Sequence, residues 1–199
     1  IAALRGDTKS LDGSVLSVQR SNTPSNLFEH IRIGVPKARV EELLGTPTYI
    51  HGGQWLYRYV ETQLEITFSD EGSISCVVVA LCHGQIYAGC NEVIDVPLGQ
   101  LTLADLLAVD PQVTAEIFHS ARTAEVFVWI RFGPSGAWTD YCFGALRVFS
   151  GAGYLQHTEF EWDYESGKLL SDPREVPINW VAITSSTFDP PAFNWFIEE

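Results

Sequence analysis

Alternating apolar runs separated by short turns constrain the fold of this chain more than any other feature of its sequence. From residue 54 to residue 68 the side chains repeat with a period of two, and Gln63–Phe68 alternates polar with apolar residues, which is typical of a β-strand with one buried face. An apolar strand, ISCVVVALC, follows. Glycine-bearing turns at 52–53 and 70–72 separate the runs. Parallel strands need crossover connections of a dozen or more residues, so these short turns predict an antiparallel meander. The expected strands are Thr48–His51, Gln54–Val60, Gln63–Phe68 and Ile74–Cys82.

A short helix with clear end signals precedes the meander, in the stretch IRIGVPKARVEELLGTPT. Pro36 lies where this helix would begin, because proline is favoured at the first helical position. Gly45 suits the left-handed conformation after a helix end, and Pro47 prevents continuation. A helix before it, capped by Thr23 and starting at Pro24, is also expected. The apolar face of the main helix consists of Val40, Leu43 and Leu44.

The same order of helix and strands recurs after residue 96, beginning with PLGQLTLADLLAVDP. Thr102 can cap this later helix, with Asp105 in a capping-box relation. We therefore expect an α+β fold of two similar units, each with short helices followed by an antiparallel β-meander. The units span residues 21–90 and 91–199, after a lead-in or stalk at 1–20, and the second ends in an aromatic C-terminal tail. Its expected strands are Val113–His119, Glu125–Phe132, Tyr141–Ser150, Thr158–Tyr164 and Trp180–Thr184.

The charge of the chain limits its partners. Twenty-five acidic residues stand against 12 basic ones, which gives a formal net charge of -13. Nucleic-acid binding rests on basic contacts to phosphate, so this balance argues against a nucleic-acid partner. It favours a basic protein partner. No stretch approaches the roughly 18 apolar residues of a membrane span.

The four cysteines indicate an oxidising compartment, because an even number of unevenly spaced cysteines fits disulfide bonds in an exported protein. Cys82 and Cys90 flank a short glycine-bearing loop, and a bridge between them would contribute about 2–3 kcal/mol on the loop-entropy model. Cys76 and Cys142 could form a second bridge. A zinc site at Cys82, His83 and Cys90 is the alternative. The chain starts without Met, so we expect that a signal peptide, a lipid anchor or a transmembrane helix preceded it.

The stretch HTEFEWDYE, residues 157–165, has the most regular pattern in the chain. Side chains alternate between the faces of a strand, so one face would be acidic and the other aromatic. An aromatic core face with a solvated acidic face is the simplest interpretation. Binding of a basic partner by the acidic face is the functional one. Paired carboxylates also serve glycoside cleavage or cation binding, but nothing in the sequence supplies a cleft.

The sequence lacks the motifs of the common catalytic and nucleotide-binding sites. Neither phosphate-loop pattern, G-x-x-x-x-G-K-[ST] or G-x-G-x-x-G, occurs. The zinc-protease pattern H-E-x-x-H and the nucleophile elbow G-x-S-x-G are also absent. We therefore expect no catalytic residues, no cofactor and no metal.

The helix and its following strands resemble a known family. The spacing Ile-x-x-Gly-x-x-x-x-x-Val-x-x-Leu-Leu-Gly-x-Pro, followed by a Trp-x-Tyr strand and a strand ending in Phe, is similar to the SmpA/OmlA (BamE-like) outer-membrane lipoproteins. β-Lactamase inhibitory proteins share that fold as tandem copies. The resemblance covers about residues 28–80, with a fainter echo from 98 to about 150, and implies an exported, non-catalytic module that contacts other proteins through its sheet. The matching positions are Ile31, Gly34, Val40, Leu43, Leu44, Gly45, Pro47, Trp55, Tyr57 and Phe68.

Together these features predict a non-catalytic protein–protein interaction module of an exported or cell-envelope protein, in the periplasm, the envelope or outside the cell. It would bind another, basic protein through the sheet face. The alternatives are an inhibitor or immunity-type protein acting on a basic enzyme, and an enzyme of unknown type. The expected contact residues are Trp55, Tyr57, Tyr59, Glu159, Glu161 and Asp163.

Overall fold

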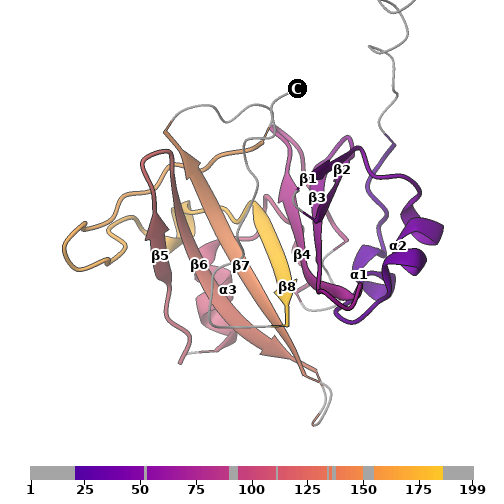
Figure 1. Ribbon diagram of the computed structural model, residues 1–199. Helices are drawn as coiled ribbons and strands as arrows, with labels where there is room; N and C mark the ends of the chain where they lie inside the picture. The colour runs from indigo at the N-terminus through magenta and orange to yellow at the C-terminus, as the bar shows by residue number, and fades with distance from the viewer. Residues whose placement is uncertain are drawn as a thin grey trace, which may run out of the picture.

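One antiparallel sheet forms the body of the molecule in a computed structural model (Figure 1). The structure describes residues 21–51, 53–89, 94–110, 112–133, 135, 138–149 and 155–185. Within these residues the sheet has eight strands in the order β1-β2-β3-β4-β8-β7-β6-β5. The strands are β1 (Tyr49–His51), β2 (Gln54–Arg58), β3 (Thr62–Phe68), β4 (Ile74–Leu81), β5 (Glu116–His119), β6 (Thr123–Phe132), β7 (Thr139–Val148) and β8 (Trp180–Thr184).

The expected division into two separate units is wrong, because a single sheet runs through both halves of the chain. The last strand, β8, lies between β4 and β7 and is antiparallel to both. Ala182 on β8 stands opposite Val78 on one side and Cys142 on the other. The described part of the fold is therefore mostly β with a few short helices, and the two meanders belong to one continuous hydrogen-bonded sheet.

The helices are short, and α1, α2 and α3 all contribute residues to the same core cluster on one side of the sheet. In Figure 1, α3 lies behind β6 and β7, and α1 and α2 lie at the right, beside the strands of the first meander. The predicted ends of α2 are confirmed to within one residue: Pro36 is the N-cap, one position before the first helical residue, and Gly45, at φ 75°, follows the last turn. The Thr102–Asp105 capping box is confirmed for α3. The first helix begins later than Pro24. The helices are α1 (Leu27–His30), α2 (Lys37–Leu44), α3 (Leu103–Val109) and the 3-10 helix η2 (Pro173–Glu175).

Alternate residues of the central strands supply two separate apolar clusters. Val77 and Val79 of β4 pack with the helices in the main core. Val78 points to the opposite side, into a smaller cluster that includes Trp180. Gly144 on β7 makes room for that indole, because a Cβ there would lie 2.2 Å from a Trp180 ring carbon. This close approach explains a glycine in the middle of a buried strand.

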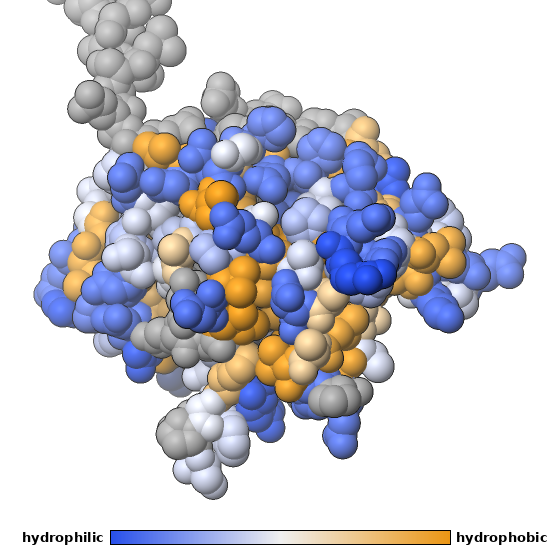
Figure 2. Space-filling view, turned by 180° about the vertical axis from the view of Figure 1, so that it is seen from behind, coloured by the Kyte–Doolittle hydropathy of each residue, from blue (hydrophilic) through white to orange (hydrophobic). Residues whose placement is uncertain are grey.

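Most predicted strands are confirmed to within a few residues, and Trp180–Thr184 has the expected bounds. The exception is Thr158–Tyr164, which belongs to no strand of the sheet, since Trp162 forms only an isolated bridge to Leu169 and Tyr164 lies in a turn. The lead-in at 1–20, Cys90 and residues 186–199, which include the aromatic tail, lie outside the described residues. On the helix-covered side, apolar surface interrupts the polar surface around α3 (Figure 2).

Candidate protein-binding surface

The acidic and aromatic segment at 157–165 runs beside the end of β7. The Thr158 backbone N–H donates to the Leu146 carbonyl at 2.7 Å, and the Thr158 hydroxyl donates to the Pro177 carbonyl at 3.1 Å. These two bonds hold the segment against the sheet without making it a strand. The alternation predicted from the sequence is confirmed as far as Asp163, but Tyr164 is exposed. The buried side chains are Thr158, Phe160 and Trp162, and the exposed ones are His157, Glu159, Glu161, Asp163, Tyr164 and Glu165.

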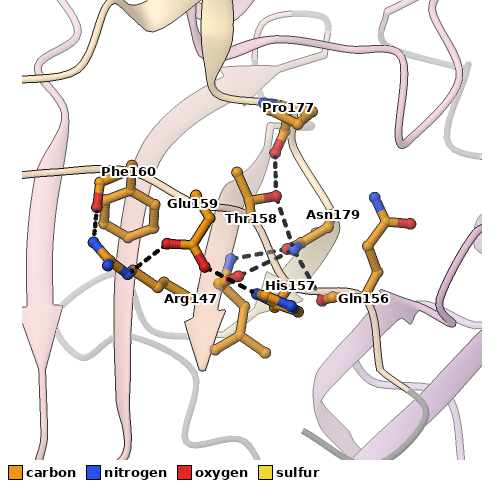
Figure 3. Close-up of polar contacts among 9 residues, drawn as sticks. Arg147, Gln156, His157, Thr158, Glu159, Phe160, Pro177 and Asn179 are labelled. Carbon is orange, nitrogen blue, oxygen red and sulfur yellow. Dashed lines mark hydrogen bonds and ion pairs between the residues drawn. The ribbon is translucent and has the colours of Figure 1, made fainter. Parts of the chain in front are cut away.

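Asn179 anchors this segment through its side-chain amide (Figure 3). Its side chain is almost completely buried and lies just before β8. The Asn179 Oδ1 accepts from the Leu146 N–H at 2.9 Å, and Nδ2 donates to the Gln156 carbonyl at 3.0 Å. The same Nδ2 lies 3.3 Å from the Thr158 hydroxyl. One amide side chain therefore joins β7, β8 and the acidic segment.

Arg147 and Glu159 form the polar centre of the segment (Figure 3). The Arg147 Nε lies 3.1 Å from the Glu159 Oε2, and Arg147 Nη1 donates to the Phe160 carbonyl. The other Glu159 oxygen lies 3.6 Å from His157 Nδ1. Arg147 is thus held by a carboxylate and a carbonyl, while most of the Glu159 side chain stays in solvent.

The carboxylate of Asp163 stabilises a turn in its own segment. Its Oδ1 accepts hydrogen bonds from the backbone N–H groups of Glu165, at 2.8 Å, and Ser166, at 3.3 Å. These bonds lower the pKa of Asp163, because they favour its charged form. Gly167, at φ 66°, completes the turn by donating to the Asp163 carbonyl. The carboxylate therefore shapes a hairpin turn between Trp162 and Leu169.

Aromatic rings from three parts of the chain gather around Trp162. We call the set His119, Phe149, Trp162 and Tyr164 the Trp162 patch. The indole of Trp162 has its ring centroid 4.7 Å from Tyr164, 5.9 Å from His119 and 6.2 Å from Phe149. Trp162 itself is buried, and its indole N–H donates to no described residue. The other members of the patch cover it from β5, from the end of β7 and from the turn.

The outer rings of the Trp162 patch face solvent. Tyr164 is 68% exposed and Phe149 is 44% exposed. The guanidinium carbon of Arg147 lies 5.5 Å from the centre of the Phe149 ring and 6.0 Å from that of Trp162. This surface therefore already combines aromatic faces, a carboxylate and a cation.

The aromatic contact residues expected on β2 and just after it are buried, so the structure corrects their placement. Trp55, Tyr57 and Tyr59 point into the main core beneath the helices. The Tyr57 hydroxyl donates to the Gly45 carbonyl at 3.1 Å. Burial raises the pKa of both tyrosines, and in Tyr57 the charges of Tyr59 and Glu41 add to that effect. Of the expected contact residues, only Glu159, Glu161 and Asp163 are exposed, and they share one short segment.

The cysteines of the described residues form no disulfide bond with one another. Cys76 and Cys142 are free thiols, and β8 lies between their strands. Neighbouring strands are about 4.8 Å apart, so two strand spacings exceed the Cα separation of a disulfide bond. The expected Cys76–Cys142 bridge is therefore wrong. The Cys82–Cys90 bridge stays a prediction, since Cys90 lies outside the described residues.

The described residues meet the requirements of neither a metal site nor a membrane-spanning helix. No group of three or more His, Cys, Asp or Glu side chains there could hold a metal ion. No described helix is long and apolar enough to cross a membrane. Comparison with known proteins found no matching family model, curated protein or solved structure. The resemblance to the SmpA/OmlA family therefore stays a prediction.

Sequence reasoning identified the acidic segment but missed its neighbours. His119, Arg147 and Phe149 meet this segment only through the fold, because His119 lies on β5, Arg147 on β7 and Phe149 just after β7. The alternation along β7 placed Arg147 on the same face as Ala145, a core residue. Nothing in the sequence indicated that a later loop would cover that face.

Proposed function

We propose that this chain is a non-catalytic protein-binding module that takes a basic segment of another protein at the Trp162 patch. The observation that carries the proposal is the exposure of Tyr164 and Phe149 next to a row of solvent-facing carboxylates. Aromatic residues are enriched at protein interfaces because they bury a large area while losing few rotamers.

The charge around the patch favours a cationic partner. Between residues 157 and 175, six carboxylates stand against Lys168 and Arg174. Three of the six have tasks within the fold: Glu159 pairs with Arg147, Asp163 caps its turn and Asp172 pairs with Arg174. The structure records no side-chain bond for Glu161 or Glu165 among the described residues, and both are exposed. These two carboxylates can meet a cation without breaking an existing pair.

Arg147 shows which kind of side chain this surface accommodates. Its guanidinium lies over two aromatic rings and is paired with a carboxylate. A cation over an aromatic face contributes about 0.5–1 kcal/mol when exposed and more when desolvated. An arginine of a partner protein would meet the same combination of an aromatic ring and a carboxylate on the solvent side of the patch. It would lie between Tyr164 and the carboxylate of Glu161 or Glu165.

The proposal moves the expected binding site from the sheet face to the segment at its end, since the expected aromatic residues of β2 are buried. We further propose that the two halves are related copies. Each places a helix before a run of four strands, and the strand order is mirrored about the β4–β8 pair. An exported location remains part of the proposal and is supported by the spacing of Cys82 and Cys90.

The test uses a synthetic eight-residue peptide with arginine at alternate positions and threonine between, and a matched peptide with glutamate in place of arginine. Calorimetry at physiological salt should detect binding of the arginine peptide only. Tyr164→Ala and Phe149→Ala should each weaken this binding about tenfold, as expected for aromatic anchors. Tyr49→Ala is the matched control, because Tyr49 is also exposed but lies on β1 at the opposite edge of the sheet.

Two results would overturn the proposal. One is that the arginine peptide does not bind at millimolar concentration. The other is that Tyr49→Ala weakens binding as much as Tyr164→Ala, since the attraction would then come from the net charge of the whole chain and not from the Trp162 patch.

A further inference from the structure

The strand next to the Trp162 patch is an edge of the sheet. β5 pairs with β6 on one side, and no other described strand pairs with it. Glu116, Phe118 and His119 are exposed, and Phe118 is 50% exposed. An edge strand presents unpaired backbone groups that can bind a further strand.

The hydrogen-bond pattern identifies which groups face outward. The Ser120 N–H donates to the Thr123 carbonyl at 2.7 Å at the turn between β5 and β6. Bonded and non-bonded pairs alternate along an antiparallel ladder, so Phe118 bonds to β6, as does Glu116. The backbone N–H and C=O groups of Ile117 and His119 therefore point away from the sheet, toward the open edge.

The open edge and the Trp162 patch lie side by side. The His119 ring lies 5.4 Å from the ring of Tyr164, centroid to centroid. The turn that carries Tyr164 projects past β5, at the left of Figure 1. A chain that added to β5 would lie about 4.8 Å beyond it, next to this turn and its carboxylates.

We propose that the partner's basic segment binds in an extended conformation, as an added strand on β5, with backbone hydrogen bonds to Ile117 and His119. This inference rests on the proposed function and gives its binding mode. Side chains of an added strand alternate between the two faces of the sheet. Those on the patch side meet Tyr164 and the acidic turn, and those on the other side meet Glu116 and Phe118.

The charges on both sides of the edge support this occupant. Glu116 is exposed on one face, and Glu161 and Glu165 are exposed in the segment at the other. The opposite edge, β1, has only three residues and lies at the far end of the sheet. β5 is thus the edge whose surroundings complement a basic chain.

The experiment uses the arginine peptide with backbone N-methyl groups at either its odd or its even positions. Both versions keep every side chain, but only one keeps the amides that would face β5. Strand addition predicts that one version binds about tenfold more weakly or worse, because it loses hydrogen bonds and clashes with the edge, while the other keeps its affinity. If both versions bind as well as the parent peptide, strand addition is wrong and the proposed function survives. If both versions lose their binding equally, strand addition is also wrong, because no single set of amides then faces the protein.

A second measurement tests the same backbone contacts on the protein. On saturation with the parent peptide, amide hydrogen exchange should slow at Ile117 and His119 and change little at Phe118, whose N–H already bonds within the sheet. Unchanged exchange at Ile117 and His119 in the bound state would overturn the inference. Failure of the parent peptide to bind at all would instead remove the proposed function.

Discussion

Asn179 holds the acidic segment against the sheet through the hydrogen bonds of its side-chain amide. It lies just before β8 begins, at a level where the neighbouring strand β7 continues, so backbone groups of β7 would be left without a strand partner there. The amide of Asn179 supplies both an acceptor and a donor to Leu146. Its second N–H holds the start of the acidic segment through Gln156. A buried polar group with this many bonds is stabilising only while all of them are made.

Asn179→Ala should therefore destabilise the protein by about 2–4 kcal/mol, because it leaves the buried Leu146 N–H without its acceptor. Urea unfolding followed by circular dichroism measures this loss. Asn26→Ala is the matched control, since Asn26 is exposed and its side chain makes no cap hydrogen bond to α1. Among the described residues its side chain is recorded only beside the exposed His30, so the change should alter stability by less than about 0.5 kcal/mol. Equal midpoints for the two variants would show that the Asn179 network contributes nothing.

Cysteine thiols and a tyrosine hydroxyl that are shielded from solvent make the folded state less stable at alkaline pH. Burial, with a contribution from Glu65, raises the pKa of the Cys76 thiol from 9.0 to about 12. Burial also raises the pKa of Cys142 and of Tyr57. A group whose pKa is higher in the folded state stabilises the fold fully below its unfolded pKa. That contribution is lost as the pH rises toward the folded pKa.

The free energy of unfolding should therefore be flat with respect to Cys76 below about pH 9 and fall between about pH 9 and 12. Denaturant titrations at a series of pH values from 7.5 to 10.5 would measure the slope. Cys76→Ala removes one of the contributing groups, so its stability should fall less steeply above about pH 9. Identical slopes for the variant and the parent protein would contradict the raised pKa of Cys76.

Among the elements, α3 shows how local sequence sets packing. The Thr102 hydroxyl accepts from the Asp105 N–H at 3.3 Å, and Asp105 Oδ2 accepts from the Thr102 N–H at 2.9 Å. This capping box starts the helix at a residue that brings Leu103 and Leu106 into the core, where both are fully buried.

Thr102→Ala should destabilise the protein by about 1 kcal/mol, since it leaves a helix N–H without its acceptor. Thermal unfolding should show a lower midpoint for this variant, whereas Thr102→Ser keeps the hydroxyl and should lie close to the parent protein. A serine variant as unstable as the alanine variant would assign the loss to the threonine methyl group and its packing.

The elements also show what the sequence could predict and why the rest was missed. Caps and turns depend on neighbouring residues, so α2, α3 and the strands of both meanders were recognised from local pattern. The segment from Thr158 to Tyr164 has the alternation of a strand, yet its backbone bonds go to single residues of β7 and of the loop before β8. Alternation records which side chains are buried and not which chain lies alongside. For the same reason, the buried faces of Trp55 and Tyr57 could not be distinguished from a contact surface before the helices were placed over them.

At the scale of the whole molecule, the pairing of β4 with β8 decides the architecture. These strands are separated by about a hundred residues, and their contact turns two meanders into one continuous sheet. Both strands are apolar on both faces, which is typical of strands in the middle of a sheet. The consequence is that short strands, β1 and β5, form the two edges, and only β5 lies beside the Trp162 patch.

The negative net charge of the whole chain should raise the association rate of a basic partner. A charge of -13 attracts cations over distances set by the ionic strength, whereas contacts at the Trp162 patch are short-range. For the arginine peptide, stopped-flow measurements should show an association rate that falls about tenfold or more between about 20 mM and 500 mM salt, while the dissociation rate changes much less. Tyr164→Ala should do the opposite, raising the dissociation rate with little effect on association, because it removes a contact and no charge. A dissociation rate that carries most of the salt dependence would show that ion pairs at the bound surface, and not long-range attraction by the chain, dominate the electrostatics of binding.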